Sequence, residues 1–298
     1  MNIFLNENSV TKCSIDEYIR EIDCPVQKTM IEHLFFDAME FLETIRKSAL
    51  PYPDKPLIKI TKGSTQFLQA IDGLIEIDTA FIQLCFTNKE APLNEIINPT
   101  LIGEPSIKST PNILFCWALA HEYYHGLRKH NLATYDISTT ELTSHALEMD
   151  ADLCATAALY RWAQTNISSI YCDTTIRKIV FASIFWGINT LPKSESNETH
   201  PSHAVRIYQI LSKLIQIRQD KYHPADQSLS TEEARNNLSK MVDFMHECYV
   251  HYLAQDEITA KKIIGEIFQH LESGEYKLVI REWERIKTLV SICSGTRT

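Results

Sequence analysis

The sequence predicts an α+β fold that is predominantly helical and carries one small β-sheet. Apolar residues recur at helical spacing after Pro25 and again over most of the chain from Pro111 onward. Two short runs of alternating β-branched residues lie between these regions. The composition, 298 residues with 44% hydrophobic and 22% charged, is that of a folded globular protein. We therefore expect helices around a sizeable core, with a sheet of few strands.

The first expected element is a helix of roughly twenty residues that begins at Pro25, because proline is favoured at the first helical position. The apolar residues that follow at helical spacing are Val26, Met30, Ile31, Leu34, Phe35 and Leu42. Three prolines within 51–56 end this helix, since proline lacks an amide hydrogen and excludes α geometry. We predict a linker there, which divides an N-terminal helical segment, 1–50, from a second domain, 57–298.

Two strands are expected next, at 57–61 and 74–78, and together they form the small sheet. From Pro111 the pattern is helical, with breaks near 165–169, 193–199 and 220–230. The segment 179–191 is uncharged and apolar, but it is shorter than the roughly 20 residues that span a bilayer. We interpret it as a buried helix.

Composition argues against several functional classes. The formal net charge is −9 and the chain has no long Lys/Arg run, which argues against nucleic-acid binding through phosphate contacts. The eight cysteines are scattered without a C-x-x-C pair. The first seven residues lack the basic and apolar regions of a secretory signal. We expect a cytoplasmic protein with neither nucleic-acid nor membrane partners.

The strongest chemical signal is the sequence His-Glu-x-x-His at 121–125. On a helix, two histidines four residues apart project from one face, so both rings can reach one metal ion while Glu122 lies beside it. A catalytic zinc ion takes three protein ligands and keeps water in the fourth position. The spacing therefore predicts that His121 and His125 bind one Zn²⁺ ion and that Glu122 is the general base.

A third ligand is expected on a second helix, in the segment Glu-Met-Asp-Ala-Asp at 148–152. Ser138 and Glu141 form the pattern of a capping box that starts this helix. Residues four apart share a helix face, and a ligating histidine usually donates its second N–H to a carboxylate. We predict that Glu148 binds the metal and that Asp152 holds a histidine.

A competing pattern places the third ligand six residues beyond the second histidine, with a glycine three residues beyond it. Those positions hold Asn131 and Arg128, and His130 is one place off the register. The competing pattern therefore fails.

These motifs resemble the gluzincin metallopeptidases, in which H-E-x-x-H is followed by E-x-x-A-D on the next active-site helix; residues 148–152 match this element completely. The segment Thr-His-Pro-Ser-His-Ala-Val-Arg-Ile at 199–207 is similar to the T-H-P-x-x-x-x-R-I element of HtpX-type gluzincins. In length and order of elements the chain is most similar to the Lit-type phage-exclusion peptidases. The resemblance covers about 113–217.

The resemblance implies zincin-like active-site helices and a metallopeptidase core over 113–217. It also implies a zinc-dependent endopeptidase that cleaves an intracellular protein in phage defence, with a translation elongation factor as substrate. The site residues that it implies are the zinc ligands His121, His125 and Glu148, the general base Glu122, and His200 and Arg206 as stabilisers of the substrate oxyanion.

Two other functions remain open. One is a regulatory metallopeptidase that cleaves a repressor or an antitoxin. The other is a non-catalytic binding module stabilised by zinc, which a fourth protein ligand would distinguish, because structural zinc sites are closed. The strands have two interpretations as well, plain structural pairing or an edge that binds an extended peptide. For a protease that must spare its host, we also expect a low basal activity and a peptide or protein activator.

Overall fold

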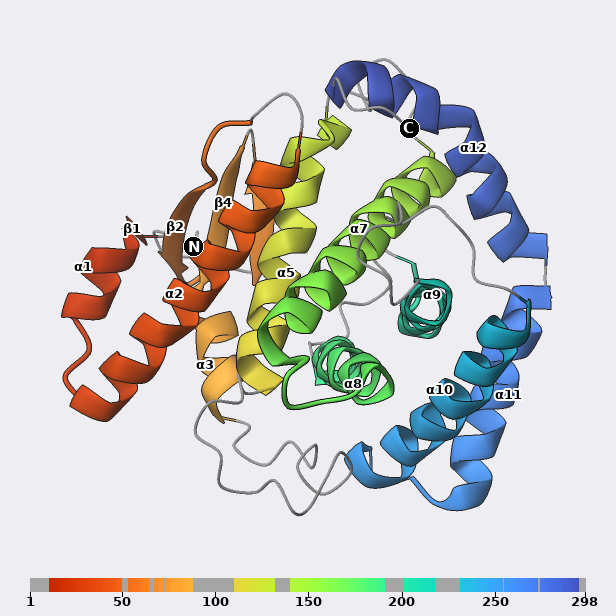
Figure 1. The fold of residues 1–298 in the computed structure, drawn as a ribbon. Coiled ribbons are helices and arrows are strands. Elements are labelled where there is room, and N and C mark those ends of the chain that lie inside the picture. The colour runs from red at the N-terminus through yellow and green to blue at the C-terminus, as the bar shows by residue number, and fades with distance from the viewer. Residues whose placement is uncertain are drawn as a thin grey trace, which may run out of the picture.

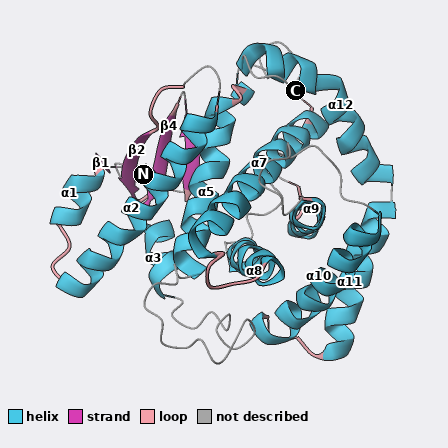
Figure 2. Cartoon of the chain, in the orientation of Figure 1, coloured by secondary structure: helices cyan, strands magenta, loops and turns pink. Residues whose placement is uncertain are grey.

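The computed structural model describes residues 11–49, 53–64, 67–71, 73–87, 110–131, 140–190, 201–217, 231–253, 255–272 and 274–294. Its strands are β1 (Thr11–Cys13), β2 (Leu57–Lys62), β3 (Leu68–Ile71) and β4 (Leu74–Asp78). Its helices are α1 (Ile15–Arg20), α2 (Pro25–Ser48), α3 (Thr79–Thr87), α5 (Thr110–Leu127), α7 (Glu141–Ile167), α8 (Asp173–Thr190), α9 (His203–Gln216), α10 (Thr231–Tyr252), α11 (Glu257–Glu272) and α12 (Gly274–Ser294). The strands gather on one side and helices make up the rest (Figure 2), which confirms the expected fold class.

The sheet has the strand order β1-β2-β4-β3. The two expected strands are confirmed as β2 and β4, and they pair in parallel with Leu57 opposite Leu74. The edge strands β1 and β3, which the sequence pattern did not predict, each add an antiparallel pair. Gly73, just before β4, has a φ of 81°, a left-handed conformation that glycine adopts without steric cost. A Cβ placed on Gly126 of α5 would lie 3.8 Å from the Cα of Gly73, so the sheet end closely approaches this helix.

Helix α2 confirms the expected helix from Pro25 and packs against α5. The buried face of α2 differs from the expected one at its start, because the side chains of Val26 and Met30 are 70% and 43% exposed. The buried face is formed by Ile31, Leu34, Phe35, Ala38, Phe41, Leu42 and Ile45. Residues 51 and 52 of the expected linker lie outside the described residues, and the domain division there stays a prediction.

Helix α7 runs through the middle of the molecule, where it contacts α5, α8, α9 and α12 (Figure 1). Its start corrects the expected capping box: the N-cap is Thr140, whose hydroxyl accepts a hydrogen bond from the amide of Thr143 at 3.2 Å. This hydroxyl satisfies an amide that the first helical turn leaves unpaired. Ser138 lies outside the described residues.

Helix α8 is the expected buried helix, with Phe181 and Phe185 almost fully covered. The expected break near 165–169 coincides with the end of α7, whereas 193–199 and 220–230 fall outside the described residues. In the part of the chain that the structure describes, no helix is both long and apolar enough to cross a membrane.

The surroundings of two helical glycines, Gly187 in α8 and Gly265 in α11, predict opposite effects on stability when each is replaced by alanine. A Cβ on Gly187 would lie 2.2 Å from Cδ1 of Leu114, a fully buried side chain, whereas a Cβ on Gly265 of α11 meets nothing within 4 Å. Alanine gains about 1 kcal/mol over glycine in a helix, but overpacking a core costs about 1–3 kcal/mol. Urea unfolding should show that Gly265→Ala raises the free energy of unfolding by about 0.5–1 kcal/mol and that Gly187→Ala lowers it by about 1 kcal/mol. Equal stabilisation by both would contradict this close packing.

Candidate metal centre

The H-E-x-x-H motif lies in the last two turns of α5. The preceding turns are buried in the core through Ile113, Leu114, Phe115, Trp117 and Leu119. This anchoring fixes the direction in which the motif side chains leave the helix. His121 is 5% exposed, whereas Glu122 and His125 are partly exposed. The second helix, α7, crosses α5 and presents Glu148 to the same place.

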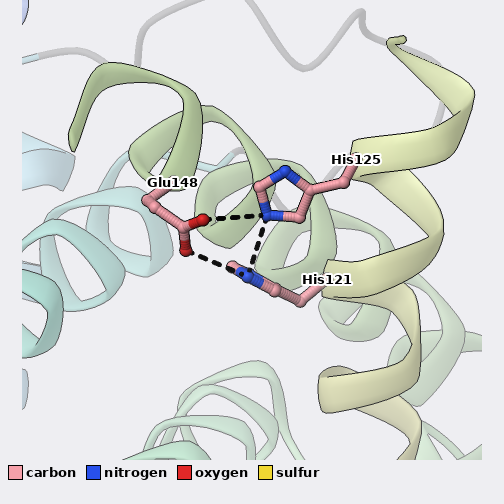
Figure 3. A group of neighbouring side chains, drawn as sticks. All are labelled: His121, His125 and Glu148. Atoms are coloured by element: carbon pink, nitrogen blue, oxygen red, sulfur yellow. Dashed lines mark hydrogen bonds and ion pairs between the residues drawn. The ribbon is translucent and has the colours of Figure 1, made fainter. Parts of the chain in front are cut away.

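The side chains of His121, His125 and Glu148 converge, as Figure 3 shows. The Nε2 atoms of the two histidines are 3.1 Å apart. Each lies 3.3 Å from one carboxylate oxygen of Glu148. A tetrahedral zinc ion with bonds of about 2.0–2.1 Å separates its ligand atoms by about 3.3–3.4 Å. Both the kind and the spacing of these donors therefore fit zinc.

The second ring nitrogen of His121, on the side away from Glu148, contacts a buried carboxylate. Its Nδ1 atom lies 2.8 Å from Asp152, whose side chain is completely buried. Arg206 of α9 donates from Nε and Nη2 to the two oxygens of Asp152, both at 2.8 Å. The guanidinium also lies over the ring of Trp117, which donates to Thr156. The contact of Asp152 with a histidine is the one that the sequence predicts.

The charges around the site favour a cation there. Burial disfavours a charged ring at His121, but Asp152 and Glu148 outweigh burial and raise the pKa of His121 to about 10. Burial alone would raise the pKa of Glu148, yet the contacts with His125 and His121 hold that pKa well below its ordinary value. Burial would likewise raise the pKa of Asp152, but Arg206 and His121 lower it to about 2. The site thus keeps two carboxylates, those of Glu148 and Asp152, ionised at neutral pH.

A second group of contacts, around His125, was missed by sequence reasoning. The Nδ1 atom of His125 lies 2.9 Å from Nδ1 of His130, and Nε2 of His130 lies 3.1 Å from Asp150. Arg128 donates to both oxygens of Asp150, at 2.6 and 3.2 Å. His130 is 3% exposed, and burial lowers its pKa to about 4, so its ring is neutral at neutral pH. The one available signal was His130, off register as a ligand yet five residues from His125.

The other expected residues divide between described and undescribed parts of the chain. Glu122 lies on α5 beside the ligands, and its charge acts on Arg206. It makes no hydrogen bond or ion pair with a residue that the structure describes. Arg206 lies at the site, paired with Asp152, and its action on a substrate oxyanion stays a prediction. His200 falls outside the described residues.

Comparison with known proteins identifies the family. The model of the Peptidase U49 family matches residues 27–225, about two thirds of the chain, and this span includes strands β2, β3 and β4 and the helices α5 and α7. No curated protein and no solved structure shows significant similarity. The match extends well beyond the H-E-x-x-H helix, so it does not rest on a short motif alone. The chain therefore belongs to the Peptidase U49 family of proteolytic enzymes.

Proposed function

We propose that this peptidase is a zinc-dependent endopeptidase of the gluzincin type. The observation that carries the proposal is the convergence of His121, His125 and Glu148 from two helices, with donor atoms within 4.8 Å of one another. Two imidazoles and one carboxylate are a donor set of catalytic zinc sites, which keep one position open. Among the described residues, no fourth His, Cys, Asp or Glu joins this group. This supports an enzyme over the zinc-stabilised binding module.

A zinc ion held by these residues would lower the pKa of a water molecule towards about 7 and polarise the peptide carbonyl. Glu122 is suited to act as general base, because it is partly exposed and unpaired with any described residue. It would take a proton from the attacking water and return it to the leaving amine. Arg206 uses Nε and Nη2 to hold Asp152, so we assign its Nη1 group, together with His200, to the oxyanion.

We further propose that the substrate is an intracellular protein that binds in an extended conformation. Strand β3 is at the sheet edge and packs against α5, so an added substrate strand would run close to the motif helix. The resemblance to Lit-type peptidases favours a translation elongation factor as substrate, cleaved during phage infection. Cleavage of a repressor or an antitoxin is the alternative that substrate identification would separate.

The test is to map new protein N-termini in a bacterial extract incubated with the purified chain, with and without phage proteins as activator. We expect a small set of cleavages that disappear after zinc chelation and return when zinc is added. Cleavage that persists in excess chelator would contradict the zinc mechanism. Vigorous cleavage of many unrelated proteins without phage proteins would contradict the need for an activator.

A further inference from the structure

Each histidine of the metal centre is connected by a route of side-chain contacts to an aspartate that is paired with an arginine. The ring of His121 contacts Asp152 directly, and the ring of His125 reaches Asp150 through His130. Both oxygens of each aspartate accept hydrogen bonds from one arginine, Arg206 for Asp152 and Arg128 for Asp150. The second route uses a residue, His130, to which the ligand motif assigns no role.

The contacts fix where the protons lie along this second route. Asp150, paired with an arginine, can only accept, so the hydrogen of His130 is on Nε2. A His130 ring that carries this one hydrogen offers a lone pair at Nδ1, which faces Nδ1 of His125. His125 must therefore carry its hydrogen on Nδ1 and donate it to His130, which leaves Nε2 of His125 with the lone pair that faces Glu148. This tautomer is the one that coordination through Nε2 requires.

The placement of His130 requires an unfavourable backbone conformation at Lys129. Helix α5 ends at Leu127, and Lys129 follows with a φ of 52°. A non-glycine residue in the left-handed region is disfavoured by about 1 kcal/mol, and such strain tends to occur at functional sites. The turn directs His130 back against His125, the last histidine of the helix. An extended exit from the helix would carry His130 away from the site.

The C-terminal helix supports the same route. Helix α12 packs on α7 through Val279, Ile286 and Val290, which contact Leu147 and Met149 in a small hydrophobic cluster. Trp283, at the edge of this cluster, places its ring 5.7 Å from the guanidinium carbon of Arg128. This helix lies beyond the residues that the family model matches. It therefore contributes to the metal centre from outside the family region.

We propose that His130 and Asp150 are positioning residues that fix the ring and tautomer of His125 for zinc binding, with Arg128 holding Asp150 in place. This inference rests on the proposed zinc function. Residues that orient a ligating histidine typically change metal affinity by about 10–100-fold when they are replaced.

Two substitutions at His130 separate positioning from packing. His130→Phe keeps a ring of similar size but has no acceptor, whereas His130→Asn keeps an acceptor near the position of Nδ1 but loses volume. We expect zinc affinity, measured by competition with a chelator of known affinity, to fall about 10–100-fold in the Phe variant and clearly less in the Asn variant. His246→Phe, on α10, is the matched control and should leave the affinity unchanged. Wild-type affinity in the Phe variant, or an equal loss in both, would overturn the proposal.

A second measurement does not depend on zinc. In the metal-free, ¹⁵N-labelled wild-type chain, NMR should detect a scalar coupling across the hydrogen bond between Nδ1 of His125 and Nδ1 of His130. Absence of this coupling would overturn the positioning role, whether or not zinc binds. If the coupling is present and the wild-type chain binds no zinc, the proposed function fails while the hydrogen bond stands, so the two failures are distinguishable.

Discussion

Replacement of Glu122 by glutamine is expected to abolish peptide hydrolysis while zinc stays bound. The amide has nearly the same shape as the carboxylate but cannot accept the proton of the attacking water. General-base catalysis contributes about 10²–10⁴-fold to a rate, so cleavage should fall by at least that factor. The three donors of the metal centre are unchanged by this substitution. Zinc content and cleavage rate, measured on the same preparation, check both parts of the expectation.

The matched control is Glu266→Gln, the same chemical change on the surface of α11, where the side chain is 60% exposed. It should leave the cleavage rate unchanged. Two results would contradict the role of Glu122: near wild-type cleavage by the glutamine variant, or loss of zinc from it, since the second would make Glu122 a metal ligand.

Replacement of Glu148 by glutamine is expected to remove most of the zinc affinity. The glutamine keeps the volume but loses the negative charge that faces both imidazoles at 3.3 Å. Because we propose Glu148 as a direct ligand, the loss of zinc affinity should exceed the roughly 10–100-fold effect of residues that only orient ligands. Competition with a chelator measures this loss, and cleavage should fall with it.

Glu141→Gln is the control for this substitution, because it makes the same change on α7 at a side chain that is 69% exposed. Its zinc affinity should equal that of the wild-type chain. A Glu148→Gln variant with wild-type affinity would show that zinc is bound by a different set of residues.

The parts of the fold that the sequence predicts are those determined by local pattern. Helix α2 follows from the proline at its first position and a long apolar repeat, and β2 and β4 follow from short alternating runs. The residue at which a helix begins is harder to predict, as for α7, whose N-cap is Thr140. The sequence pattern places the cap at Ser138, whereas the path of the chain places it at Thr140.

The elements that the sequence did not predict depend on contacts between distant residues. Strand β1 has three residues, too few for a recognisable alternation, and it is defined by pairing with β2 some fifty positions later. Strand β3 has four residues and is fixed by pairing with β4. Strand propensity depends strongly on such partners, so short edge strands leave little signal in the sequence.

The candidate site divides in the same way. The approach of Glu148 and Asp152 to His121 follows from helical spacing and the usual chemistry of zinc ligands. The contact between His130 and His125 requires the left-handed backbone of Lys129, which nothing in a lysine side chain predicts. Asp150 is in the same segment as Glu148, but its role depends on Arg128, which follows α5.

The most direct test of the central claim is a crystal structure of the zinc-loaded wild-type chain, with anomalous diffraction measured on both sides of the zinc absorption edge. The account predicts one zinc peak bonded to Nε2 of His121, Nε2 of His125 and a carboxylate oxygen of Glu148, with a non-protein ligand in the fourth position. A peak elsewhere, or a fourth protein side chain that closes the site, would contradict it.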